Sequence, residues 1–114
     1  MKCMLEYLFG NPTIEKILFF LEKNEECYPS QLREVFETPL YSFQRALSRL
    51  EAGSVVVSHR KGKTLIYQFN PRYPFLKELR AFLQKAYLFF PEEIRNKFYE
   101  PIVRKRPRRA GKPL

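Results

Sequence analysis

Polar side chains that can read nucleic-acid bases are concentrated between residues 41 and 52. The apolar residues of this stretch recur at the three- and four-residue steps of a helix with one buried face: Leu40, Phe43, Leu47 and Leu50. The opposite face offers arginine for guanine, glutamine for adenine, and serine for a base edge or a phosphate. We therefore predict a recognition helix in a DNA major groove that uses Tyr41, Ser42, Gln44, Arg45, Ser48 and Arg49. The alternative is an ordinary solvated helix face.

A second set of cations falls at the tip of a predicted β-hairpin. Residues 55–60 and 64–69 are rich in β-branched and aromatic side chains, and residues 61–63 would join them as a three-residue loop. In that register the buried face would carry three pairs: Val55 with Phe69, Val57 with Tyr67, and His59 with Leu65. The tip would reach DNA phosphates beside the groove through Arg60, Lys61 and Lys63. The alternative is a hairpin whose lysines only prevent pairing at a sheet edge.

The third set of cations lies in the C-terminal stretch of residues 101–114. This stretch contains three prolines and six positive residues, with no acid among them, in a chain whose net charge is +9. Such a segment cannot build a core, so we predict a disordered arm that contacts DNA phosphates or the minor groove. Its cations are Arg104, Lys105, Arg106, Arg108, Arg109 and Lys112. The alternative is a tail that only raises solubility.

The composition leaves little material for catalysis. The chain has no aspartate and one histidine, His59, which argues against a Ser-His-Asp triad and two-metal chemistry. No glycine-rich phosphate loop or Cys-x-x-Cys pair occurs, and Cys3 and Cys27 are too few for a zinc site or a disulfide framework. We therefore expect a protein that is not an enzyme, with no catalytic residue, metal site or cofactor.

The sequence does not have the pattern of a membrane or exported protein. No apolar run approaches the roughly 20 residues that a membrane-spanning helix needs. Residues 1–9 include Glu6 and lack an ending typical of a cleavage site, so they do not make a convincing signal peptide. We expect a cytoplasmic, nucleoid-associated protein.

The elements that would position the cationic residues can be traced along the chain, whose 114 residues suit one domain. Asn11 is a favourable cap and Pro12 a favourable first residue for a helix over residues 12–23. A second, supporting helix follows over residues 29–36. A turn of the length used in helix-turn-helix units would join it to the recognition helix.

A helix expected over residues 74–88 has a wider apolar stripe than a small three-helix body needs. A two-fold dimer would bury the excess and present two recognition helices to a pseudo-palindromic site. The predicted dimer interface comprises Phe19, Leu79, Phe82, Leu83, Ala86 and Tyr87. The alternative is a fourth core helix that closes the monomer. A further short helix would run to about Tyr99.

The order of these elements resembles the winged helices of ArsR-like bacterial transcriptional regulators. The resemblance spans residues 8–88, and its motifs are Leu50-Glu51-Ala52-Gly53 at a helix end, a valine strand, Gly62-Lys63, Tyr67 and Asn70-Pro71. It implies a winged helix-turn-helix fold, DNA binding and dimerisation through terminal helices. Metal-sensing members of that family place cysteine or histidine ligands on a helix, and the expected recognition helix has neither.

These patterns predict a mainly α fold with a small β-hairpin, of the α+β class, in the form of a winged helix-turn-helix with extra C-terminal helices. Residues 1–100 would form the DNA-binding domain with its dimerisation helices, and residues 101–114 the basic arm. We expect a homodimer that binds double-stranded DNA sequence-specifically as a transcriptional repressor. Two alternatives stay open: a protein-interaction module, such as an accessory or antitoxin-like subunit, and a non-specific nucleic-acid binder.

Overall fold

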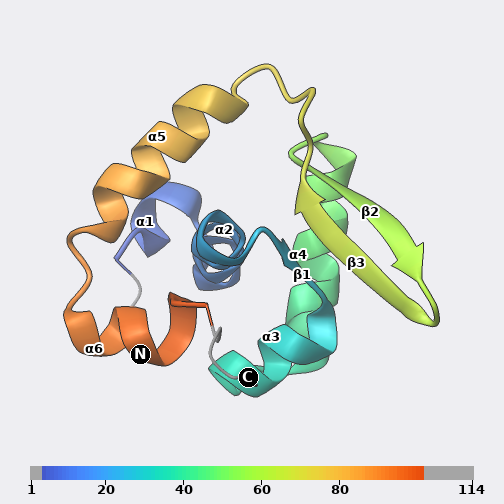
Figure 1. Cartoon of the computed structure of the whole chain (residues 1–114), viewed down its shortest axis with the longest axis horizontal. Helices are drawn as coiled ribbons and strands as arrows, with labels where there is room; N and C mark the ends of the chain where they lie inside the picture. Colours follow the sequence, from blue (N-terminus) through green and yellow to red (C-terminus); the bar gives the residue numbers. More distant parts are fainter. Residues whose placement is uncertain (1–3, 102–114) are drawn as a thin grey trace, which may run out of the picture.

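The computed structural model describes residues 4–101, which form six α-helices, one π-helix and a three-stranded sheet, an α+β fold (Figure 1). Along the chain the elements are α1 (Glu6–Phe9), α2 (Pro12–Asn24), β1 (Glu26–Cys27), α3 (Pro29–Phe36), α4 (Leu40–Ala52), β2 (Val56–Lys61), β3 (Thr64–Phe69), α5 (Leu76–Tyr87), α6 (Glu92–Ile94) and the π-helix η1 (Arg95–Tyr99). The helices expected from apolar periodicity are therefore present, with ends that differ by one or two residues. The predicted basic arm lies outside the described residues.

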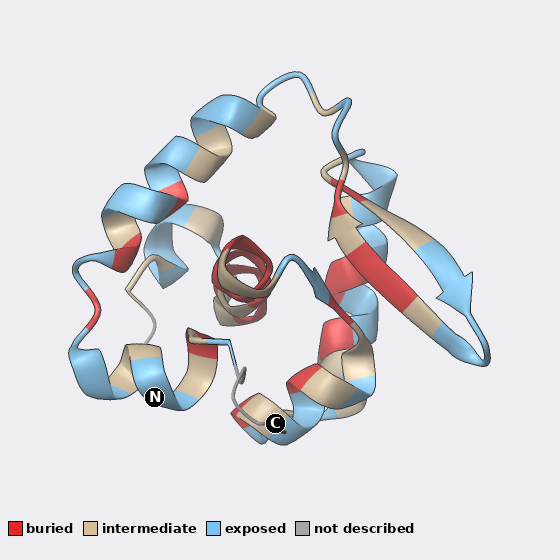
Figure 2. Cartoon of the chain, viewed as in Figure 1, coloured by how far each residue is buried: buried red, intermediate tan, exposed pale blue. Residues whose placement is uncertain are grey.

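Helix α2 is the centre of the fold, and Figure 2 shows it buried between the other elements. The Asn11 side chain caps it, because its Oδ1 accepts hydrogen bonds from the backbone N–H of Thr13 at 2.7 Å and of Ile14 at 3.4 Å. Helix α2 contacts α1, α4, α5, β1 and η1. Its apolar residues are accordingly buried on every side: Ile14, Ile17, Leu18, Phe19, Phe20 and Leu21.

The sheet has the strand order β1-β3-β2, and both pairings are antiparallel. The predicted three-residue hairpin loop is wrong. Lys61 pairs with Thr64, so the loop consists of Gly62 and Lys63 alone. Gly62 has a φ of 63°, the left-handed conformation that begins the tight two-residue loops favoured in hairpins.

The shorter loop shifts the hairpin register by one residue, so the residues of β2 exchange faces relative to those of β3. The predicted pairs of Val55 with Phe69, Val57 with Tyr67 and His59 with Leu65 are therefore not formed. The pairs on the same face as Phe69 are Val56 with Phe69, Ser58 with Tyr67, and Arg60 with Leu65. Three residues of this face belong to the buried core: Val56, Tyr67 and Phe69.

An aromatic cluster joins α2 to the C-terminal elements. The ring centroid of Phe19 lies 4.9 Å from that of Phe90, 5.9 Å from that of Tyr99 and 6.3 Å from that of Tyr87. Phe19, Leu83 and Tyr87 are consequently buried inside the monomer. This corrects their predicted place in a dimer interface, because the C-terminal helices close the core of the monomer and use these side chains themselves.

Polar contacts fix α5 against α2. The buried Glu22 carboxylate accepts hydrogen bonds from Arg80 Nε at 2.8 Å and from Gln84 Nε2 at 2.9 Å. The Arg80 guanidinium also lies over the Phe69 ring, 5.5 Å from its centroid. A carboxylate can be buried here because these two donors replace water.

Glu15, which is fully buried in α2, holds the N-terminal segment in a similar way. Its carboxylate accepts hydrogen bonds from the backbone N–H of Met4 at 2.9 Å and of Leu5 at 2.5 Å. Burial raises the pKa of Glu15, and the two hydrogen bonds oppose this effect without cancelling it.

We predict that Arg80→Met lowers the free energy of unfolding by about 1–3 kcal/mol, because the buried Glu22 carboxylate loses a charged donor. Lys77→Met removes a cation from an exposed position of the same helix and should change stability by less than about 0.5 kcal/mol. Urea denaturation followed by circular dichroism measures both variants. Equal effects would show that the Arg80 contact adds nothing.

The raised pKa of Glu15 predicts a pH dependence of stability. Because the native state binds this proton more tightly than the unfolded chain, the stability that Glu15 contributes is present below the unfolded value of 4.5 and is lost as the pH rises through the folded value. The free energy of unfolding of the wild type relative to Glu15→Gln should therefore fall over that window, by at most about 1.4 kcal/mol per pH unit. Urea denaturation of both proteins from acidic to neutral pH measures the difference, and a constant difference would refute the assignment.

Candidate nucleic-acid interface

Helix α4 presents the predicted base-reading residues to solvent. It packs on the core through Phe43, Ala46 and Leu47. On the other side Tyr41, Gln44, Arg45, Ser48 and Arg49 are exposed, and Ser42 is half-buried at the edge. Tyr41 leaves 61% of its surface exposed, so the fold does not use this aromatic ring for its core.

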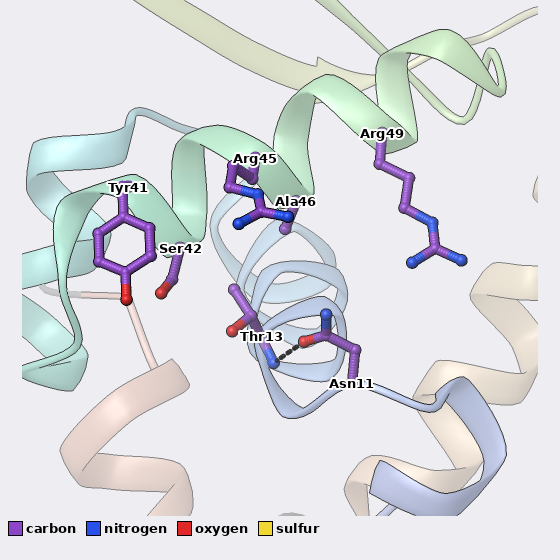
Figure 3. Close-up of a pocket in the computed structure, with 7 residues that line it drawn as sticks. All are labelled: Asn11, Thr13, Tyr41, Ser42, Arg45, Ala46 and Arg49. Atoms are coloured by element: carbon purple, nitrogen blue, oxygen red, sulfur yellow. Dashed lines mark hydrogen bonds between the residues drawn. The ribbon is translucent and has the colours of Figure 1, made fainter.

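A groove of about 420 Å³ lies between α4 and the first turn of α2 (Figure 3). Its lining brings together Asn11, Thr13, Tyr41, Ser42, Arg45, Ala46 and Arg49. Four predicted base-reading residues therefore share this groove, while Gln44 and Ser48 do not line it. Asn11 and Thr13 carry no sequence signal of a site, because only folding brings the start of α2 beside α4.

The groove is positively charged. None of the ion pairs within residues 4–101 involves Arg45 or Arg49, and no acidic residue lines the groove. The first turn of α2 adds the positive end of a helix dipole. A phosphate or another anion is the class of ligand that such a groove favours.

The β2–β3 hairpin is fixed to the end of α4. Ser58 Oγ donates a hydrogen bond to Glu51 Oε2 at 2.6 Å, and the backbone N–H of Val55 donates to the carbonyl oxygen of Leu50 at 2.9 Å. Figure 1 shows the hairpin on the opposite side of the molecule from α5 and α6. The cations predicted to contact phosphates are exposed at or beside its tip: Arg60, Lys61 and Lys63.

Within the part of the chain that the structure describes, the remaining reactive side chains do not gather into another site. Burial, with a smaller effect of Glu26, raises the pKa of the Cys27 thiol to about 12, which favours its neutral form over the nucleophilic thiolate. His59 is exposed on β2. Within residues 4–101 no group of three or more histidine, cysteine, aspartate or glutamate side chains is placed to hold a metal ion. None of the helices in that range combines the length and apolar character needed to cross a bilayer.

The candidate interface thus comprises the exposed face of α4, the groove beside it and the hairpin tip. The six arm cations predicted to contact DNA, from Arg104 to Lys112, lie outside the described residues. Comparison of the chain with models of protein families, with curated proteins and with solved structures finds no significant match.

Proposed function

We propose that this chain is a sequence-specific regulator that binds double-stranded DNA through a winged helix-turn-helix. In this proposal α3 is the supporting helix, α4 the recognition helix, and β2–β3 the wing. The observation that carries it is the exposed face of α4. Its donors occupy successive turns, and the side chains of Tyr41, Arg45 and Arg49 form no hydrogen bond or ion pair within residues 4–101.

The dimensions of α4 and the hairpin support the same proposal. The 13 residues of α4 make a rod roughly 20 Å long, and a major groove about 12 Å wide admits a helix. The hydrogen bond between Ser58 and Glu51 connects the hairpin to the end of α4. Its basic tip would therefore meet phosphates beside the groove that α4 occupies. The basic arm would add affinity that falls with salt.

A separate apolar surface supports self-association. A groove of about 310 Å³ between the N-terminal segment and the end of α5 is lined by Met4, Leu5, Phe82, Lys85, Ala86 and Phe89. Phe82 is 40% exposed and Phe89 is 72% exposed, and adjoining apolar side chains of this kind mark interaction surfaces. We propose that two copies meet here. Of the residues predicted for the dimer interface, Phe82 and Ala86 line this groove. Leu79 does not line it and is half-buried against the core.

The same apolar groove supports a second candidate function, that of a protein-interaction module. In that case a different protein, and not a second copy, would cover Phe82 and Phe89. The two candidates differ in what the purified chain does alone: a self-associating regulator forms dimers without any partner, whereas an accessory subunit remains a monomer until its partner is added.

Selection of duplexes from a random-sequence pool with the full chain, followed by fluorescence-anisotropy titration over a salt series, tests the DNA-binding proposal. A regulator should prefer the selected duplexes over random ones by at least about a thousandfold. Equal affinity for selected and random duplexes would contradict the regulator and support the alternative of a non-specific nucleic-acid binder. No binding to any duplex would leave the protein-interaction module.

We predict that Arg45→Ala relaxes the preference at one base position by about 1–3 kcal/mol and leaves the other positions unchanged. The arginine would lose its hydrogen bonds to one base edge, which no neighbour can replace. Lys77→Ala removes the same charge from an exposed position on α5 and should leave the preference intact. Repeating the selection with both variants measures the change. A uniform loss over all sequences would instead assign Arg45 to the phosphate backbone.

We also predict that Phe89→Glu converts the dimer to a monomer, because it places a charge in the apolar groove. Phe75→Glu is the matched control, since Phe75 is 63% exposed just before the start of α5 and does not line that groove. Sedimentation equilibrium over the micromolar range gives the mass, and circular dichroism checks that both variants fold. A wild-type chain that is monomeric throughout this range would overturn the homodimer.

A further inference from the structure

The capping residue of α2, Asn11, also lines the groove beside α4. The oxygen of the Asn11 side chain is fixed by the two backbone N–H groups that donate to it. The amide nitrogen must therefore point the other way, and Figure 3 shows it directed toward the space between Arg45 and Arg49. The capping geometry thus assigns the orientation of this amide and leaves a donor facing the groove.

Thr13 supplies a second, independent sign of a ligand. It lines the groove, and only 9% of its surface is exposed. Its hydroxyl forms no hydrogen bond with any of residues 4–101. This oxygen is not one of the enclosed polar atoms, so it is open to the groove, where a ligand can reach it.

The other polar groups of the groove are also donors. Arg45 and Arg49 bring two positive charges, and Tyr41 and Ser42 bring hydroxyl groups. The acid in the first turn of α2, Glu15, does not line the groove, because its carboxylate is bound to the N–H groups of Met4 and Leu5. An anion with several acceptor oxygens would satisfy these donors, and a tetrahedral phosphate has that character.

We propose that the start of α2 and the facing flank of α4 form a clamp for one phosphate, occupied in the complex by a backbone phosphate of the DNA strand that runs beside α4. The amide of Asn11 and the hydroxyls of Thr13 and Ser42 donate to the phosphate oxygens, and Arg49 supplies the charge. Arg45, nearer the middle of α4, stays available to a base edge. That the ligand is a phosphate is inferred from the groove itself. That this phosphate belongs to DNA rests on the proposed function.

The clamp would set how α4 sits in the major groove. Phosphate contacts carry no sequence information themselves, but they fix the register in which a recognition helix meets the bases. Losing the clamp should therefore weaken binding to all duplexes in parallel and preserve the preference among them. This separates Asn11 and Thr13 from a residue that reads a base.

The variant Asn11→Asp tests the clamp without removing the cap. Aspartate caps helices as well as asparagine does, so α2 should remain intact, but its second oxygen repels phosphate where the amide donated. Affinity for selected and random duplexes should fall about ten- to a hundredfold. The slope of log affinity against log salt should become less steep by about 0.9, the value for one phosphate contact. Thr13→Val should weaken binding about three- to tenfold.

The matched control is Asn96→Asp, which makes the same change of charge on an exposed residue of η1 that does not line this groove. It should alter affinity less than about twofold because distant surface charges are screened. If Asn96→Asp weakens binding as much as Asn11→Asp does, or if Asn11→Asp has no effect on a chain that binds DNA, the clamp is refuted while DNA binding stands.

Duplexes with single uncharged methylphosphonates identify the clamped phosphate. At one position of one strand the substitution should weaken the wild type about tenfold and leave Asn11→Asp almost unaffected, the coupling expected of a direct contact. No such position would refute occupancy by DNA.

Titration of the full chain with inorganic phosphate, followed by NMR of the Asn11 side-chain amide and the Thr13 backbone amide, tests the groove apart from DNA. Asn11→Asp has no side-chain amide, so the variant is followed at the Thr13 backbone amide alone. In a chain that binds no duplex, saturable shifts of both amides in the wild type, with the Thr13 shift lost in Asn11→Asp, would support the clamp with a small phosphate as its ligand and refute the proposed function. No shifts in such a chain would refute both.

Discussion

The structure depends on the burial of α2 on all sides. A helix whose apolar residues point in several directions cannot be covered by one neighbour, so elements from both ends of the chain must close around it. The ring contacts of Phe19 with Phe90 and Tyr99 cover a side that the three helices α2, α3 and α4 leave open. The C-terminal helices are therefore part of the core and not an addition to it.

Polar residues of α2 have two different roles: some bind the terminal elements of the chain, and others face α4. Glu15 binds the N-terminal segment, Glu22 binds α5, and Asn24 Nδ2 donates to a carbonyl oxygen of η1 at 2.8 Å. Each of these contacts is made within the monomer and fixes one terminal element. Asn11 and Thr13 at the start of the helix differ, because they turn donors toward α4. The same helix that organises the core therefore also contributes to the candidate interface.

Local patterns were sufficient to predict the helices, since apolar periodicity located α4 and the Asn11–Pro12 pair located the start of α2. They were not sufficient for the hairpin register, because the run Val55-Val56-Val57 places valine on both faces and fits either register. They also failed for Phe19, because an apolar side chain off the main stripe has the same sequence signature whether it is buried by its own chain or by another. The groove beside α4 could not be predicted, since Thr13 and Arg49 line it together only after folding.

The two grooves differ in chemistry in a way that suits two different partners. The groove beside α4 offers donors and positive charge, whereas the groove at the end of α5 is bordered mainly by apolar side chains. Because α5 and the hairpin lie on opposite sides of the molecule (Figure 1), association through the α5 side would leave α4 and the hairpin uncovered in both copies. A two-fold axis there would fix the separation of the two α4 helices, and with it the spacing of the half-sites that they could read. Dimerisation would then determine operator geometry without contacting DNA.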